Sequence, residues 1–318
     1  MPDEAKPVLV IGSLNMDLVV RCEHLPQRGQ TIMGGDFLTA PGGKGANQAV
    51  AAARLGARVS MAGCVGRNAF GDTLIAGLRD AGIRTDDVMR VDSQTGIALI
   101  TVDAAGANTI VVASGANMDC DAALVDRALA NAGGSGILLL QHEIPPEANA
   151  RAVAAAHRAG WFVMLNPAPA RPIPADLLPL VDLVMPNETE AATIAGCRIA
   201  NRSDALAAAR SLLTAGARAV LVTLGADGAI YCDASSAWHC PTVSVQAVDT
   251  TAAGDAYIGA LAAALAEPKP LRESLGYAAA AAALAVTRLG AQPSLPSSED
   301  LATFIAQHGM PVVQAMSG

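Results

Sequence analysis

The stretch GGKGANQAVAAARLGARVSMA, residues 42–62, contains a glycine-rich turn, a helical segment and a strand in direct succession. We expect a helix over Ala46–Leu55 that ends at Gly56, because glycine readily takes the positive φ found just after many helices. The apolar run Val59–Ala62 then predicts a strand covered on both faces. A helix that leads into a buried strand is typical of a parallel α/β sheet.

The same alternation extends along the chain in both directions. The other predicted strands are Val8–Ile11, Ile137–Leu140, Phe162–Leu165, Leu183–Met185 and Val220–Thr223. Helices are expected at Phe70–Ala81 and Pro146–Ala159, with Ser203 as the N-cap of another. The expected fold class is therefore α/β: a Rossmann-like three-layer domain over residues 1–318, with a mostly parallel central sheet.

Two stretches interrupt this alternation. Residues 17–39 contain the strand-like pieces Leu18–Arg21 and Thr31–Leu38, and residues 95–113 contain Gly96–Val102 and Asn108–Val112. Neighbouring strands without an intervening helix indicate a small β-sheet lid beside the main sheet, in segments of about 15–40 and 95–115. Ordinary edge hairpins are the alternative.

Composition excludes several classes of protein. Of 318 residues, 52% are hydrophobic and 16% charged, which excludes a mainly disordered chain. The net charge of −8 and the 3% of aromatic residues argue against a nucleic-acid partner. No apolar run reaches the length of a membrane span, and the acidic start does not resemble a signal peptide. We expect a cytoplasmic protein with no membrane contact.

Two polar motifs could bind a sugar. Asn15 and Asp17 follow the first strand and, two residues apart in an extended chain, point to the same side, where they could hold neighbouring hydroxyls. An Asx turn is the alternative. In residues 42–48, three glycines let a ligand approach the backbone of a helix N-terminus, and Lys44 and Asn47 add donors. A plain glycine-rich turn is the other interpretation.

The segment Val248–Asp255 is the most informative one for chemistry. Small residues lead into a predicted helix over Asp255–Ala266, whose first N–H groups would form an anion hole. A carboxylate beside an anion hole suits a base that deprotonates a hydroxyl attacking a phosphoryl group. Alternatively, Asp255 is only a first-turn acid favoured by the helix dipole.

Two further turns follow predicted strands. Residues 223–228 form a glycine-containing turn that could face nucleotide phosphates or could simply close a hairpin. The carboxylates of Asn187-Glu188-Thr189-Glu190 could organise a hydrated magnesium ion, or could belong to a helix start enriched in acids.

Together these motifs resemble the PfkB sugar-kinase family. The resemblance rests on N-x-D, G-G-K-G-A-N-Q-A, N-P-A-P-A (166–170), N-E-T-E, T-L-G-x-x-G, V-D-T-x-A-A-G-D and V-T-R-x-G-A-Q-P-S (286–294), over residues 8 to 295. The second and last of these are typical of the ribokinase branch. The sequence departs from the usual pattern at Ala256-Tyr257-Ile258 and at Ala279, which bears on nucleotide preference and sugar selectivity.

The resemblance implies phosphorylation of D-ribose at O5 by ATP with Mg²⁺, activation by K⁺, and a homodimer formed through the lids. It assigns the sugar to Asn15, Asp17, Gly42, Gly43, Lys44, Gly45, Asn47 and Glu143. Asp255 would be the base, and Ala252, Ala253 and Gly254 the anion hole. The nucleotide would contact Asn187, Thr223, Leu224, Gly225, Ala226, Asp227, Gly228 and Gly254, with Glu190 near Mg²⁺. The monovalent cation would be held by Asp249, Thr251, Ala285, Arg288, Gly290 and Ser294.

Three alternatives remain at this point. One is a related kinase of the same family that acts on 2-deoxyribose, a nucleoside or another sugar. Another is a non-catalytic sensor of sugars or nucleotides on the same fold, against which the presence of Asp255 and the anion-hole sequence argues. The third is a dinucleotide oxidoreductase, which is disfavoured because no strand is followed by G-x-G-x-x-G.

Overall fold

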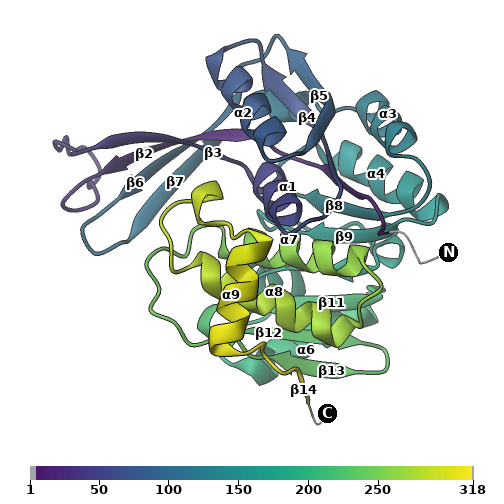
Figure 1. The fold of residues 1–318 in the computed structure, drawn as a ribbon. Coiled ribbons are helices and arrows are strands. Elements are labelled where there is room, and N and C mark those ends of the chain that lie inside the picture. Colours follow the sequence, from purple (N-terminus) through teal and green to yellow (C-terminus); the bar gives the residue numbers. More distant parts are fainter. Residues whose placement is uncertain (1–4, 317–318) are drawn as a thin grey trace.

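The computed structural model describes residues 5–316 (Figure 1). Its strands are β1 Val8–Ile11, β2 Asn15–Arg21, β3 Phe37–Gly42, β4 Val59–Gly66, β5 Arg84–Val91, β6 Gly96–Val102, β7 Asn108–Ala113, β8 Ile137–Gln141, β9 Phe162–Asn166, β10 Leu183–Val184, β11 Ala219–Thr223, β12 Ala229–Asp233, β13 Ala237–Cys240 and β14 Gln314–Ala315. Its α-helices are α1 Lys44–Arg54, α2 Ala69–Asp80, α3 Ala122–Ala132, α4 Pro146–Arg158, α5 Glu188–Ala195, α6 Arg202–Thr214, α7 Ala253–Ala266, α8 Leu271–Ala285 and α9 Ser298–His308.

The larger sheet has ten strands in the order β14-β13-β12-β11-β10-β9-β8-β1-β4-β5. Its strands run parallel from β5 through to β11, and only β12, β13 and β14 pair antiparallel. All four residues of β1 are buried because helices cover both faces of the sheet. The predicted mostly parallel α/β sheet is confirmed, and the six strands expected for it are all present.

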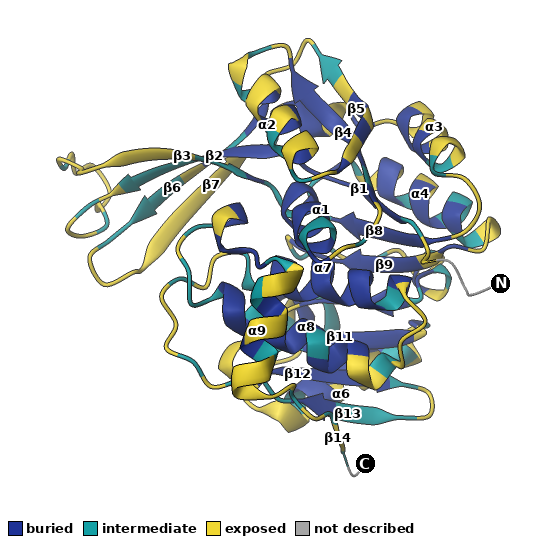
Figure 2. Cartoon of the chain, viewed as in Figure 1, coloured by how far each residue is buried: buried dark blue, intermediate teal, exposed yellow. Residues whose placement is uncertain are grey.

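Side chains alternate between two hydrophobic cores, one on each face of this sheet. Along β1, Val8 and Val10 belong to the core beneath α1, α7 and α8, whereas Leu9 and Ile11 belong to the core beneath α3, α4 and α6. This period of two follows from strand geometry. The buried sheet and helix faces form the dark interior in Figure 2.

A separate four-stranded sheet has the order β3-β2-β6-β7 and projects from the body (Figure 1). Strands β2 and β6 are parallel, whereas β3 and β7 pair antiparallel at the edges. The strand predicted at Thr31–Leu38 is misplaced, since β3 spans Phe37–Gly42. The reason is tertiary: Pro41 and Gly42 extend to pair with Met16 and Asn15 of β2.

Three predicted helix starts are also wrong. Helix α1 begins at Lys44 rather than Ala46 because groups elsewhere in the chain accept from its first N–H groups, as described below. Helix α7 begins at Ala253 rather than Asp255. The N-cap of α6 is Asn201 rather than Ser203, because the Asn201 side chain accepts from the N–H of Asp204. Among residues 5–316, none of the helices combines the length and apolar character needed to cross a bilayer.

Candidate active site

Polar residues gather where the parallel strands end, at the edge of the sheet where doubly wound folds bind ligands. A cavity of about 380 Å³ lies there, at the start of α7. It is lined by residues from several of these strand ends and from α1 and α7, among them Lys44, Asn166, Asn187, Glu190, Thr223 and Asp255. The fold therefore brings together, in one cavity, side chains such as Lys44 and Asp255 that lie more than 200 positions apart in the sequence.

Asp255 lies in the first turn of α7 and is only 7% exposed. Its two carboxylate oxygens accept different hydrogen bonds: Asn47 Nδ2 donates to Oδ2 at 3.0 Å, and Gln48 Nε2 donates to Oδ1 at 2.9 Å. Both donors come from α1. The carboxylate is therefore held in one orientation at the wall of the cavity.

The residue before α7 has an unusual backbone conformation. Ala252 has φ 59°, and no other residue except glycine has a positive φ among residues 5–316. Such a conformation costs about 1–3 kcal/mol and is concentrated at functional sites. It turns the chain so that Ala252, Ala253 and Gly254 line the cavity, where the helix start leaves N–H groups without intrahelical acceptors.

Glu143, which follows the end of β8, binds the backbone of the glycine-rich segment. Its Oε2 accepts from the Lys44 N–H at 3.0 Å and from the hydroxyl of Ser13, which itself accepts from the Gly45 N–H at 3.2 Å. At Gly43, φ is 87° and a Cβ would lie 2.7 Å from the Asn15 nitrogen. Only glycine fits at this position, which fixes the start of α1 against β2.

Asn15 and Asp17 lie near the start of β2 and are 2% and 9% exposed. Both pair with β3 and β6 as part of the strand, so the Asx turn considered as an alternative is not formed. Asn117 Nδ2 donates to Asn15 Oδ1 at 2.7 Å. Burial raises the pKa of Asp17 to about 7, and the carboxylates of Glu143 and Asp255 add to this shift. Three carboxyl groups are thus close enough to influence one another.

Lys44 is the cation among these acids. Burial by itself lowers the pKa of Lys44, but the carboxylates of Asp255, Glu143 and Glu190 outweigh burial, and the resulting pKa is raised. The ammonium group therefore stays charged in a cavity that would otherwise carry a concentrated negative charge.

Asn187 and Glu190 form a capping box at the start of α5. The side chain of Asn187 accepts from the Glu190 N–H at 2.8 Å, and Glu190 Oε2 accepts from the Asn187 N–H at 2.9 Å. Residues 187–190 therefore do form the acid-rich helix start that was one of their two interpretations. Both residues also line the cavity, and burial raises the pKa of Glu190 although this hydrogen bond and Lys44 oppose the shift.

The turn at residues 223–228 closes the β11–β12 hairpin and also borders a second cavity of about 90 Å³. Thr223, Gly225 and Gly228 line this cavity together with Tyr257 and Ala279.

The other three expected nucleotide contacts of this turn do not line either cavity. Leu224 is buried in a core, Ala226 is exposed, and the Asp227 carboxylate pairs with Arg202 at 3.0 Å. A sequence motif marks a whole turn, whereas the backbone path decides which of its residues face a ligand.

The expected monovalent-cation residues come from two loops that meet. Asp249 Oδ1 accepts from the Thr251 N–H at 2.9 Å, and Oδ2 accepts from the Gly290 N–H at 2.8 Å. Ser294 donates its hydroxyl to the Ala291 carbonyl, and Ala285 ends α8 nearby in sequence. The Arg288 side chain instead pairs with Asp300 at 3.0 Å.

The sequence motifs did not assign any role to four amide side chains that support this site. Gln48 contacts Asp255, Gln141 donates to Gln48 at 2.7 Å, and Asn166 accepts from Gln48 at 3.1 Å. Asn117 holds Asn15. Their positions in the sequence could have indicated this role, since Gln141 and Asn166 each end a buried strand, and strand ends form the edge of the sheet where ligands bind.

Comparison with known proteins agrees with this geometry. The sequence model of the pfkB family of carbohydrate kinases matches residues 5–298. The chain belongs to this family. The expected family and enzyme class are thereby confirmed, and a kinase that uses ATP requires a divalent cation such as Mg²⁺.

This carbohydrate kinase is similar to proteins of several organisms. It is 42% identical to the ribokinase of Schizosaccharomyces pombe, over 91% of this chain and 95% of the relative. It is 36% identical to the deoxyribokinase of Salmonella typhi, over 94% and 98%. The structure of Arabidopsis thaliana ribokinase complexed with ribose and ATP matches it with a TM-score of 0.85 at 35% identity, over 95% of this chain and 99% of the other. The kinase thus has the expected ribokinase-like fold.

Proposed function

We propose that this kinase transfers the γ-phosphoryl group of ATP to O5 of D-ribose, giving D-ribose 5-phosphate and ADP, with Asp255 as the general base. The observation that carries the proposal is a fixed carboxylate at a helix start whose first residues, Ala252 to Asp255, line the same cavity. The carboxylate takes the hydroxyl proton while the N–H groups of residues 252–255 stabilise charge on the phosphoryl oxygens. The ribokinase relatives support this choice of substrate.

In this proposal the sugar lies between β2 and the start of α1. Asn15, Asp17, Asn47 and Glu143 accept from or donate to its hydroxyls, and Gly42, Gly43 and Gly45 let it approach the backbone. The ammonium of Lys44 interacts with the transferred phosphoryl group as well as the sugar. The nucleotide occupies the two adjoining cavities, with its base against Tyr257 and Ala279 in the smaller one.

The metal assignments rest on the donor groups present. Glu190 is a buried carboxylate on the cavity that would receive the phosphates, and Mg²⁺ is commonly held by one or two carboxylates together with phosphate oxygens. For K⁺, the Asp249 carboxylate joins two loops whose carbonyl oxygens suit a large cation. When bound, K⁺ would supply a fixed positive charge that orders the loop before α7. Equal rates in K⁺ and in tetramethylammonium buffers would contradict this assignment.

We also propose that the four-stranded sheet is a lid and joins two copies of the chain. Apolar side chains are exposed on both sides of β7: Ile110 is 54% and Val111 65% exposed, and these neighbours point to opposite faces. One face can cover the sugar, and the other requires a different partner. Sedimentation of the wild type as a monomer at micromolar concentration would contradict the dimer.

The decisive experiment is a coupled assay of ADP release over a panel of sugars. We expect the highest kcat/KM with D-ribose. The similarity to a deoxyribokinase makes 2-deoxyribose the second candidate, and the lost 2-hydroxyl decides between them. Turnover with nucleosides alone, or ATP and ribose binding without turnover, would contradict the proposal and would favour a nucleoside kinase or a sensor, respectively.

A further inference from the structure

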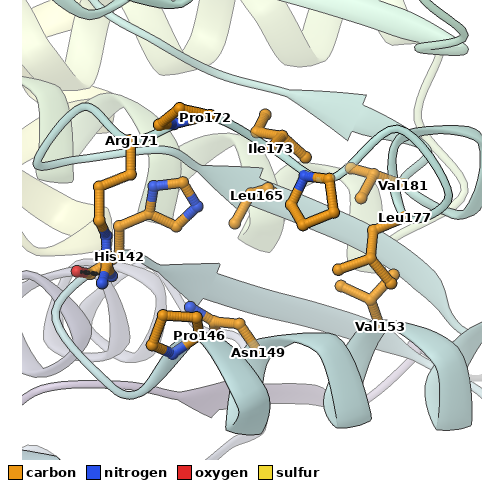
Figure 3. Close-up of a pocket in the computed structure, with 11 residues that line it drawn as sticks. His142, Pro146, Asn149, Val153, Leu165, Arg171, Pro172, Ile173, Leu177 and Val181 are labelled. Atoms are coloured by element: carbon orange, nitrogen blue, oxygen red, sulfur yellow. Dashed lines mark hydrogen bonds between the residues drawn. The ribbon is translucent and has the colours of Figure 1, made fainter.

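Another cavity, of about 260 Å³, lies beside α4, outside the candidate active site. Figure 3 shows Pro146, Asn149 and Val153 on one side of it and the segment from Arg171 to Val181 on the other, with His142 and Leu165 between them. We call it the α4 pocket, and it is lined by His142, Pro146, Asn149, Val153, Leu165, Arg171, Pro172, Ile173, Pro174, Leu177 and Val181. A concave, mostly apolar lining with few polar groups is characteristic of small-molecule sites.

Two polar atoms of the lining are buried and have no hydrogen-bond partner within residues 5–316: Asn149 Oδ1 and His142 Nδ1. Asn149 is 6% exposed, and its amide nitrogen already donates to the Gln141 carbonyl at 2.8 Å. Buried polar atoms are nearly always paired, because an unpaired one retains its full desolvation penalty. A ligand that pairs with them would therefore be held by more than its apolar contacts.

Both atoms are acceptors. Burial and the neighbouring Arg171 guanidinium lower the pKa of His142 to about 4, so the ring is neutral near pH 7. The ring is also hydrogen-bonded to the backbone of Pro169, which leaves Nδ1 as the free lone pair. An amide oxygen can only accept. The complementary ligand must therefore carry O–H or N–H donors.

The α4 pocket is connected to the candidate base through side-chain amides. Asn149 Nδ2 holds the Gln141 carbonyl, Gln141 Nε2 donates to Gln48 Oε1 at 2.7 Å, and Gln48 Nε2 donates to Asp255 Oδ1 at 2.9 Å. A ligand that moves Asn149 would move the end of β8 and thereby alter how Gln48 holds the carboxylate.

We propose that the α4 pocket binds a small, neutral, mainly apolar effector that carries O–H or N–H donors, and that its binding changes the turnover of the kinase. The binding does not depend on which sugar is the substrate, whereas the effect on turnover rests on the proposed function.

The matched probes are p-cresol and p-xylene, which differ by a hydroxyl in place of a methyl group. Binding is measured by amide chemical shifts and calorimetry in the presence of saturating ribose and a non-hydrolysable ATP analogue, so that the active site is occupied. We expect p-cresol to bind about fivefold or more tightly than p-xylene, with shifts centred on residues 142–153 and 171–181. Equal affinities, or no binding of p-cresol, would overturn the site.

Substitutions at Ile173 provide a matched pair. Ile173→Trp fills the α4 pocket and is expected to abolish p-cresol binding, whereas Ile173→Ala keeps it open; both should retain the kcat of the wild type without probe. His142→Phe removes one acceptor but keeps a ring, and should reduce the preference for p-cresol. In the wild type, bound p-cresol should change kcat by about fivefold. Binding with unchanged kcat, or a change that persists in Ile173→Trp, would overturn the effector role.

Discussion

Gln48 Nε2 lies 2.9 Å from Asp255 Oδ1, although the two residues are 207 positions apart. The same nitrogen donates to Asn166 Oδ1 at 3.1 Å, while Gln48 Oε1 accepts from Gln141 at 2.7 Å. Because its oxygen is already bound by a donor, the Gln48 amide cannot rotate to present oxygen to the carboxylate without losing these bonds. Gln48 is therefore a positioning residue for Asp255.

Gln48→Met, which keeps the length of the side chain but removes the donor, should lower kcat by about 10- to 100-fold, the effect of one lost hydrogen bond to a charged group. The KM for ATP should change little, because Gln48 does not line either nucleotide cavity. Steady-state kinetics and a melting curve on the same sample check this. A parallel loss of stability with unchanged kcat would indicate a purely structural role.

Asp255→Asn should reduce kcat by about 10²- to 10⁴-fold, because an amide cannot accept the hydroxyl proton. ATP and ribose binding should persist. The fold should tolerate the change, since Asn47 Oδ1 is buried with no hydrogen-bond partner among residues 5–316 and can accept from the new amide if the Asn47 side chain flips.

The alternative, in which Asp255 is only a first-turn acid, predicts near-normal kcat and a loss of about 1 kcal/mol of stability. Turnover and melting temperature measured together separate these outcomes. A variant with kcat within about threefold of the wild type would end the assignment of Asp255 as the base.

Asp17 should make stability depend on pH. Its pKa of about 7 in the folded protein exceeds its ordinary value of 3.8, so the folded state binds more protons than the unfolded state between these values. The free energy of unfolding therefore falls as the pH rises from about 4 to 7.

Asp17→Asn should remove this loss of stability at higher pH. It should raise the melting temperature at pH 8, with at most about 4 kcal/mol of added stability, and give no gain at pH 4. At pH 8, where Asp17 is ionised, it should also raise the KM for ribose by about tenfold or more, since a charged acceptor is lost. Thermal unfolding from pH 4 to 8 checks the first effect, and parallel curves for the two proteins would contradict it.

Position 252 should tolerate glycine but not a β-branched residue. Ala252→Gly relieves the positive φ, while the greater freedom of glycine in the unfolded chain offsets this gain, so stability should stay within about 0.5 kcal/mol. Ala252→Val should cost about 2 kcal/mol and lower kcat by about tenfold or more, because a β-branched residue strongly resists this conformation. Similar kcat values for the two variants would show that the turn geometry does not matter for catalysis.

Much of the fold could be predicted locally. Strand β1 has the predicted bounds, because a buried strand requires only a short apolar run, and neighbouring residues supply that pattern. Strand β6 of the smaller sheet also has its predicted bounds, since residues 97–102 are mostly apolar and only Gly96 and Ala98 of the strand are buried. Strand β3 was misplaced because Phe37–Gly42 is not an apolar run; its conformation comes from pairing with β2.

The sequence alone determined the order of strands and helices and the identity of the reactive groups, since both are written in short motifs such as residues 42–48 and 248–255. Only the tertiary structure decided which groups meet. The contacts of Gln48 with Asp255 and of Glu143 with Lys44 join segments far apart in the chain. Such pairs depend on how strand ends converge at one edge of the sheet, and no local periodicity encodes that convergence.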